Sequence, residues 1–424
     1  MPLSIAHFSD LHYADETLAE ADRCFSHAVD EAIRRRVDAA IITGDTTDHA
    51  LTAHSPAFFA LARQIRRLAD HCPVLMLQGT FSHEPPGMLS LFPLLGGRYP
   101  IHVADRLQQV ALTPANQWVA SGHWRFQALP ANMRLLCTCI PTMNKAALAA
   151  SVGAADAASA MGEQLTRVVA GYESDHLAAR LRGVPVVALS HGTVHGCVTE
   201  HGVPMAGADH EFTTGTLFAA EASAVMLGHI HKHQSWECGG RLVAYAGSIG
   251  RLHYGEQGDK GFLLWAVDAD ASSADLLPTP ARRSHEIAFE GPPDMDALAQ
   301  FAAKHDIAGA WVRVRWQVLE EERDLVDRRR IEQLLAEAAD VKLEGRIIPV
   351  TRARASGIAR ELSLPRQITH WATVTGTHAP DLLACLDQLR QHTPENIVAR
   401  IFQKSPPPPA SKRPNTSAIS VLPE

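Results

Sequence analysis

Two stretches near the start of the chain decide the fold: LSIAHFSDLH at residues 3–12 and VDAAIITGDTTD at residues 37–48. Each begins as a short apolar strand and ends in polar residues that favour a loop. Between them, apolar residues recur at helical spacing over residues 18–33. A second helix over residues 55–70, with Ser and Pro at its start, leads to another apolar strand at residues 72–78. The order βαβαβ predicts a layered α/β domain.

The same alternation continues to about residue 270. We expect an Ala-rich helical stretch and four further strands, at residues 145–182, 184–190, 223–229, 242–248 and 261–267. Residues 273–285 are rich in Ser, Pro and Arg, which predicts a linker. Beyond it, helix and strand patterns alternate again, at residues 294–306, 310–318, 327–340 and 341–350. This second alternation predicts a smaller α/β module.

The organisation we expect has four segments, at residues 1–272, 285–362, 363–403 and 404–424. The first two are the α/β domains. The third contains a helix with leucines along one face, which could pack on the module or dock on a partner. The last is rich in Pro, Ser and Lys, and such a composition predicts disorder.

Composition narrows the class of protein. The formal net charge is −7, so nucleic acid could be bound only through local basic patches or metals. Histidine is abundant, with 23 residues against 5 tyrosines, which favours metal or acid–base chemistry. The seven cysteines are scattered, and we expect reduced, mostly buried thiols. No leader-like segment and no apolar run of about 20 residues is evident, so we expect a cytoplasmic protein.

Carboxylate and imidazole side chains directly follow five of the expected strands. These residues are Asp10, His12, Asp45, His83, His191, His229 and His231. The carboxyl ends of strands in α/β sheets are where loops converge and ligands bind. Aspartate and neutral histidine are ligands for divalent transition metals. Alternating pairs, such as Asp10 with His12, place both side chains on one side of an extended segment. The pattern predicts a metal site at one edge of the sheet.

Longer motifs resemble a known family. GDTTD at residues 44–48, SHGTVHGCVTEHGVPM at 190–205, GHIHKHQ at 228–234 and YAGSIGRLHYGEQGDKGFLLW at 245–265 carry the resemblance. They resemble the calcineurin-like metallophosphoesterases and, within them, the SbcD-type DNA-repair nuclease subunits. The resemblance implies a four-layer sandwich of two central β-sheets flanked by helices, with a smaller C-terminal α/β capping domain. It covers residues 3–270 strongly and residues 285–362 more loosely.

The resemblance also implies roles for the residues at the strand ends. One metal would be held by Asp10, His12, Asp45 and His231, and the other by Asp45, His191, His229 and a residue of the third motif. His83 would be the catalytic histidine, and Asp48 would orient a ligand. The family uses two divalent ions, most often manganese, to hydrolyse DNA phosphodiester bonds. The resemblance also implies a homodimer and a coiled-coil ATPase partner of SbcC type.

One motif departs from the family pattern. The third motif normally reads Gly-Asn-His followed by Asp or Glu, and its Asn oxygen binds the second metal. Here the run is GTFSHE at residues 79–84, with two residues inserted. Ser82 occupies the position before His83, so it is the predicted replacement ligand, with Thr80 or a water as alternatives. Substituting Ser82 with Asn is expected to tighten manganese binding if that space is open.

The smaller module carries several arginines. Arg313, Arg315, Arg352 and Arg354 are the candidates for contacts with DNA phosphates. The alternative is a solvated face balanced by nearby glutamates at residues 320–322. Two other functions stay open at this point. One is a phosphodiesterase acting on a small nucleotide, and the other is a weakly active subunit that scaffolds DNA ends.

Overall fold

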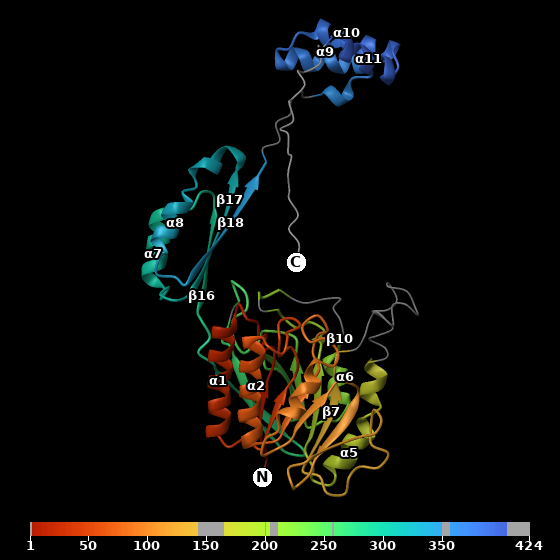
Figure 1. The fold of residues 1–424 in the computed structure, drawn as a ribbon, viewed down its shortest axis with the longest axis vertical. Coiled ribbons are helices and arrows are strands. Elements are labelled where there is room, and N and C mark those ends of the chain that lie inside the picture. Colours follow the sequence, from red (N-terminus) through yellow and green to blue (C-terminus); the bar gives the residue numbers. More distant parts are fainter. Residues whose placement is uncertain are drawn as a thin grey trace, which may run out of the picture. The chain divides into compact units, whose positions relative to one another are not determined.

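The computed structural model describes residues 2–142, 165–199, 201–203, 211–256, 258–349 and 357–404 (Figure 1). The chain divides into two compact units, Met1–Ile347 and Ile348–Glu424. Several sequence predictions lie outside the described residues: the first part of the Ala-rich helix, the candidate DNA contacts Arg352 and Arg354, and the expected tail beyond residue 404.

The first large sheet contains six strands in the order β15-β14-β1-β2-β3-β4. Their bounds are Leu3–Phe8 (β1), Ala39–Ile42 (β2), Val74–Leu77 (β3), Ile101–Ala104 (β4), Gly261–Val267 (β14) and Ser272–Pro278 (β15). Strands β1 to β4 run parallel, so their carboxyl ends share one edge. Strands β14 and β15 join antiparallel beside β1.

The second large sheet contains seven strands in the order β12-β13-β11-β8-β7-β5-β6. Their bounds are Gln108–Leu112 (β5), Trp118–Ala120 (β6), Leu135–Ile140 (β7), Val186–His191 (β8), Ala224–Gly228 (β11), Gln234–Cys238 (β12) and Arg241–Tyr245 (β13). Strands β7, β8, β11 and β13 are parallel. A short parallel pair, Thr193–Val194 (β9) and Glu211–Phe212 (β10), follows β8.

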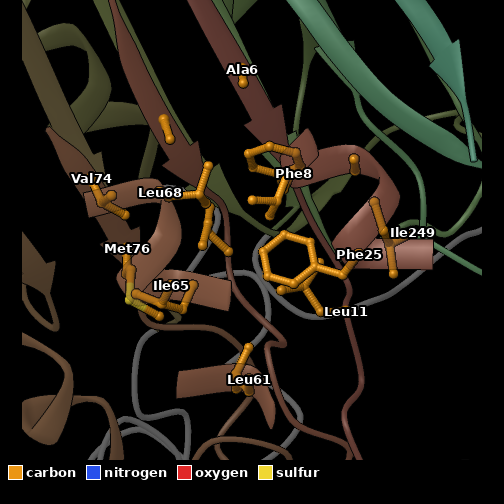
Figure 2. Packing of buried hydrophobic residues seen from close by; sticks show 14 of the residues in the cluster. Ala6, Phe8, Leu11, Phe25, Leu61, Ile65, Leu68, Val74, Met76 and Ile249 are labelled. Atoms are coloured by element: carbon orange, nitrogen blue, oxygen red, sulfur yellow. The ribbon is translucent and has the colours of Figure 1, made fainter. Parts of the chain in front are cut away.

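Helices cover the outer faces of both sheets. The helices α1 (Leu18–Arg34) and α2 (Pro56–His71) lie side by side and pack on the first sheet (Figure 1). Phe25 of α1 contacts Phe8 of β1, and Leu61 and Ile65 of α2 belong to the same buried cluster (Figure 2). The 3-10 helix η1 (Met88–Leu95) contributes Leu89 and Phe92 to this cluster. The helices α5 (Glu173–Arg180) and α6 (Thr214–Ala219) pack on the second sheet.

The inner faces of the two sheets share one apolar core. Side chains from β1, β2 and β3, such as Ile5, Ile41 and Leu75, belong to the same fully buried cluster as Val187 and Met226 from the second sheet. Helix, sheet, sheet and helix therefore form four layers. The four-layer α/β fold expected from the sequence is confirmed.

The first part of the stretch expected to be a linker, residues 273–278, belongs instead to a strand, and residues 279–283 connect it to β16. Residues 272–278 form β15, which pairs antiparallel with β14 along its whole length. Ala274 and Leu276 of this strand pack against the core between the sheets, while Ser273 and Asp275 are exposed. The polar residues misled the prediction because an edge strand with one exposed face needs only alternate apolar residues.

The smaller module is a three-stranded sheet in the order β16-β17-β18, with bounds Ser284–Glu290, Trp311–Leu319 and Asp340–Ile348. Val312, Val314 and Trp316 are buried against α7 (Met295–Lys304) and α8 (Arg328–Leu334), as the alternation predicted. The 3-10 turn η2 (Glu320–Leu325) follows β17.

The second unit is helical in its described part. It consists of η3 (Ile358–Arg360), α9 (Leu364–Thr375), α10 (Ala379–Gln391) and α11 (Pro394–Lys404). Leu386 of the leucine face is buried, whereas Leu389 is exposed.

Among the described residues, no helix combines the length and the apolar composition that a membrane span requires. All seven cysteines are unpaired, and five of them are buried.

Candidate metal centre

The loops that leave the parallel strands are joined at one edge of the sheets by backbone hydrogen bonds. The amide of Asp10 donates to the carbonyl of Gly44 (3.1 Å), and that of His12 donates to the carbonyl of Asp45 (3.0 Å). His229, just after β11, donates its amide to the Asp10 carboxylate at 3.1 and 3.2 Å. These bonds bring the ends of three strands to one place.

The backbone at this edge is strained at the residues that carry the chemistry. Asp10, His12, Asp45 and His229 all have positive φ, at 51°, 44°, 50° and 96°. Residues other than glycine rarely adopt this backbone conformation, and those that do are concentrated at functional sites. A Cβ at Gly44 would lie 2.5 Å from His191 Nδ1, so this position must remain glycine for the loops to approach.

Asp10, His12 and His231 form the first group of potential ligands. The Nε2 atoms of His12 and His231 are 3.1 Å apart. They lie 3.9 and 3.7 Å from Asp10 Oδ1. Two imidazole nitrogens and a carboxylate oxygen thus converge on one small volume.

Asp45, His191 and His229 form the second group. His191 Nε2 lies 3.2 Å from Asp45 Oδ2, and the ring centroids of His191 and His229 are 5.2 Å apart. His191 Nδ1 must donate to the carbonyl of Thr43, at 2.7 Å, because a carbonyl can only accept. This bond directs Nε2 toward the site, as backbone partners do for metal-bound histidines.

Asp45 lies between the two groups. Its Oδ2 atom is 3.2 Å from His191 Nε2 in the second group and 4.0 Å from His12 Nε2 in the first. The carboxylate is almost fully buried. A single carboxylate in this position can contribute to both groups.

The charges of the site perturb one another strongly. Burial opposes ionisation of Asp45, but His191 and His12 outweigh it and lower the Asp45 pKa. Burial likewise opposes charge on His191, yet Asp45 raises the pKa of His191 to about 10. For Asp10, burial dominates and raises the pKa of the carboxyl. Burial, together with His12, lowers the pKa of His231 well below its usual value.

These residues fit divalent cations. The Nε2 atoms of His12 and His231 lie 3.1 Å apart beside Asp10, and the other ring nitrogen of His231, Nδ1, is buried without a hydrogen-bond partner. A neutral His191 would direct its Nε2 lone pair at the Asp45 carboxylate. A cation in the second group would remove this repulsion, and the set of carboxylates and imidazoles in both groups suits transition metals. The geometry supports two cations joined by Asp45.

His83 lies beside the first group. Its Nδ1 donates to the carbonyl of Asp48 (2.5 Å), and its ring is 4.8 Å from that of His12, edge to face. The Asp48 carboxylate lies 3.4 Å from His12 Nδ1. Asp48 therefore contacts His12 through its side chain and His83 through its backbone.

Sequence reasoning missed the role of Glu84. This carboxylate is fully buried and accepts hydrogen bonds from the amides of Thr46 (2.5 Å) and Gly79 (2.6 Å). Burial and the nearby charge of Asp45 raise its pKa. Glu84 ties the loop after β3 to the loop after β2. Its position next to His83 was the available signal, since a carboxylate after an apolar strand can cap free amides.

A buried ion pair that the sequence analysis also missed contacts the backbone of His231. Lys260 Nζ lies 2.6 Å from Glu256 Oε2 and donates to the carbonyl of His231 at 2.9 Å. Both charged side chains are nearly inaccessible to solvent. Removing one partner of such a pair leaves a buried charge, so the pair fixes the loop that carries His231.

Ser82, the predicted replacement ligand, is not brought to the site. Its side chain is exposed at the tip of the turn after β3. Thr80 lies against Asp45 and His191 instead, with its hydroxyl 3.2 Å from each.

The described arginine candidates are already ion-paired within the smaller sheet. Arg313 pairs with Glu344 at 2.6 Å and Glu286 at 3.4 Å, and Arg315 pairs with Glu286 at 3.2 Å. The carboxylates that balance them therefore come from neighbouring strands, not from residues 320–322. A cavity of about 830 Å³ lies between this sheet and the loop 255–258, with Arg251, Arg313 and Arg315 in its lining.

Comparisons with known proteins give only distant similarity. No family model and no curated protein matches the chain. Among solved structures, a dimetal phosphatase from Danio rerio is 11% identical with a TM-score of 0.41, over 65% of this chain and 99% of that one. GAP50, the anchor in the inner membrane complex of Plasmodium, is 11% identical with a TM-score of 0.39, over 72% and 95%. A Vps29 mutant from Entamoeba histolytica is 12% identical with a TM-score of 0.25, over 65% and 99%. Similarity this low does not indicate a function for this chain.

Proposed function

We propose that the chain is a metal-dependent phosphoesterase with two divalent cations at the carboxyl edge of its sheets. The observation that carries the proposal is the pair of ligand groups joined by the buried carboxylate of Asp45, 3.2 Å from one group and 4.0 Å from the other. Asp10, His12 and His231 would hold one ion, and His191 and His229 the other. Two adjacent ions supply charge stabilisation for a phosphoryl group and a low pKa for attacking water.

The residues of the chain then have distinct roles. His83 is placed beside the metal ligands, and its Nδ1 is committed to the Asp48 carbonyl. Its Nε2 can therefore hold or release a proton at the oxygen that leaves. Asp48 positions both His83 and His12. Glu84 keeps the loops after β2 and β3 together, and the Lys260–Glu256 pair keeps the loop that carries His231 in place.

We further propose DNA as the substrate, with hydrolysis of phosphodiester bonds in DNA repair or DNA-end processing. Support comes from the resemblance of the motifs to SbcD-type nucleases and from the arginines of a cavity that Glu256 also lines, 4.0 Å from His231 Nδ1. Arg313 and Arg315 must exchange a glutamate partner for a phosphate to contribute, so their effect on binding depends on salt. Manganese is the metal we expect to support this activity.

A second candidate is hydrolysis of a small nucleotide ester. The cavity of about 830 Å³ favours it, because pockets of 300–1,000 Å³ are the usual size for small ligands. Its lining includes Arg251 and the two paired arginines of the smaller sheet, which suits a phosphate-bearing molecule.

Partners follow from the resemblance alone, and we propose them on that basis. They are a homodimer and an SbcC-type coiled-coil ATPase bound through residues 363–403. Support for a docking role of this segment comes from exposed apolar side chains on its helices, including Val374, Leu389 and Val398. Light scattering on the purified protein tests the dimer, and a mass of one chain would contradict it.

One experiment separates the candidate functions. The protein is incubated with Mn²⁺ and labelled single-stranded DNA, duplex DNA or bis-p-nitrophenyl phosphate, alongside His83→Ala and the exposed control His54→Ala. DNA cleavage that is lost only in His83→Ala supports the nuclease. Cleavage of the small ester alone supports the second candidate. DNA binding without any cleavage supports a scaffold, and would contradict the phosphoesterase proposal.

A further inference from the structure

Thr80 completes a regular arrangement with two ligands of the second group. Its Oγ1 lies 3.2 Å from Asp45 Oδ2 and 3.2 Å from His191 Nε2. Those two atoms are themselves 3.2 Å apart. Adjacent ligands of an octahedral ion with bonds of about 2.1 Å lie about 3 Å from each other. The triangle of Thr80, Asp45 and His191 therefore has the size of one face of a coordination shell.

The backbone, not the threonine side chain, fixes this position. The amide of Thr80 donates to Asp45 Oδ1 at 2.6 Å. The preceding residue, Gly79, donates its amide to Glu84 at 2.6 Å. A Cβ at Gly79 would collide with the backbone nitrogen and carboxylate of Asp45, so only glycine allows this approach. The Thr80 hydroxyl is thus held beside Asp45 before any cation binds.

The two inserted residues are accommodated after Thr80. The amides of His83 and Glu84 both donate to the Thr80 carbonyl, at 2.9 and 2.8 Å. Phe81 and Ser82 occupy the turn that these bonds close, and Ser82 points to solvent. The chain therefore returns His83 to the site while leaving Thr80 directly after Gly79.

We infer that Thr80, through its side-chain hydroxyl, is the fourth protein ligand of the second cation, in the role for which the sequence predicted Ser82. The inference rests on the proposed two-metal site. A hydroxyl that only oriented Asp45 would influence both ions, because Asp45 contacts both groups. A hydroxyl that binds the second cation influences that ion alone.

Metal binding without substrate tests the inference. Mn²⁺ is titrated into the metal-free protein, with heat and the electron paramagnetic resonance signal of free Mn²⁺ recorded together. The variants are Thr80→Val, which removes the hydroxyl at nearly constant shape, Thr80→Ser, which keeps it, and Thr80→Asn, which offers an amide oxygen. Ser82→Ala and Ser82→Asn are the matched controls two residues away. Melting of each metal-free variant verifies folding, and Thr80→Ser and Thr80→Asn carry the comparison if Thr80→Val does not fold.

The expected result is two Mn²⁺ per wild-type chain, with the weaker one bound about 10-fold less tightly in Thr80→Val. Thr80→Ser should restore that affinity and Thr80→Asn should raise it, while both Ser82 variants match the wild type. Equal weakening of both ions in Thr80→Val, or a change only in the Ser82 variants, would overturn the assignment of Thr80. A wild-type chain that binds no second Mn²⁺ would instead overturn the two-metal proposal on which it rests.

Discussion

The carboxyl edge of the two large sheets and the three-stranded sheet β16–β18 both gather charged side chains, but they balance those charges differently. In the smaller sheet, Arg313 and Arg315 find carboxylates on neighbouring strands, so the charges are satisfied within the protein. At the edge, the Nε2 atoms of His12 and His231 lie 3.1 Å apart and converge on Asp10 Oδ1, 3.9 and 3.7 Å away, which is too far for a hydrogen bond. This difference indicates that a ligand site is recognised by polar atoms that converge on one small volume. Charges that are paired with neighbouring strands, as in the smaller sheet, are already satisfied within the protein.

The largest effect is expected from Asp45→Asn. The substitution removes the charge of the carboxylate that lies between the two ligand groups, so it should abolish binding of at least one Mn²⁺ and lower kcat on bis-p-nitrophenyl phosphate at least about 1,000-fold. The exposed Asp105→Asn is the control. Retention of most of the activity in Asp45→Asn would make the edge no different from the paired charges of the smaller sheet.

His83→Ala should lower kcat about 100-fold while leaving the number of bound Mn²⁺ unchanged. The reason is that His83 is grouped with His12 and Asp48, and neither of the two groups joined by Asp45 includes it. Activity and Mn²⁺ stoichiometry are measured on the same preparation. Loss of a bound ion in this variant would assign His83 to the ligands.

The buried pair of Asp45 and His191 should make the metal-free protein less stable at alkaline pH. Asp45 raises the pKa of His191 to about 10, against about 6.5 for an unperturbed histidine. The stability from this raised pKa is fully present below about pH 6.5 and is lost as the pH rises toward 10. The Tm of protein treated with a chelator should therefore fall over this range.

Two comparisons check the origin of that fall. The dependence of Tm on pH should be flatter in His191→Gln, and Mn²⁺ should oppose the fall because it binds the deprotonated imidazole. An unchanged slope in His191→Gln would show that the alkaline transition originates elsewhere.

The smallest effect is expected in the three-stranded sheet. Arg315 is half exposed and pairs with Glu286, so Arg315→Ala should lower the free energy of unfolding by less than about 1 kcal/mol. Arg313 donates two hydrogen bonds to Glu344 and has a less exposed side chain, so Arg313→Ala should cost more. Urea denaturation measures both. A larger loss for Arg315→Ala would contradict the view that its charge is merely balanced.

The sequence predicted the edge well because its signals are local. Asp10, Asp45 and His191 each follow an apolar strand within a few residues, and parallel strands then bring them together. The four-layer fold could be predicted for the same reason, since each strand and helix carries its own periodicity. The edge strand β15 was missed because its exposed face is as polar as a linker.

Other features depend on distant partners and could not be predicted. The pairing of Arg313 with Glu344 joins residues on two strands whose register no local pattern reveals. The placement of Thr80 and Ser82 depends on which residues form the turn that accommodates the insertion, and the bonds to the Thr80 carbonyl decide it. The buried pair of Lys260 and Glu256 likewise becomes meaningful only once both lie behind His231.

The most direct test of the two-metal site is an anomalous difference map from crystals grown with Mn²⁺. Two peaks about 3.5–4 Å apart are expected, with the Asp45 carboxylate between them. One should touch Asp10, His12 and His231, and the other His191 and His229. A single peak, or none at this edge of the sheets, would contradict the account.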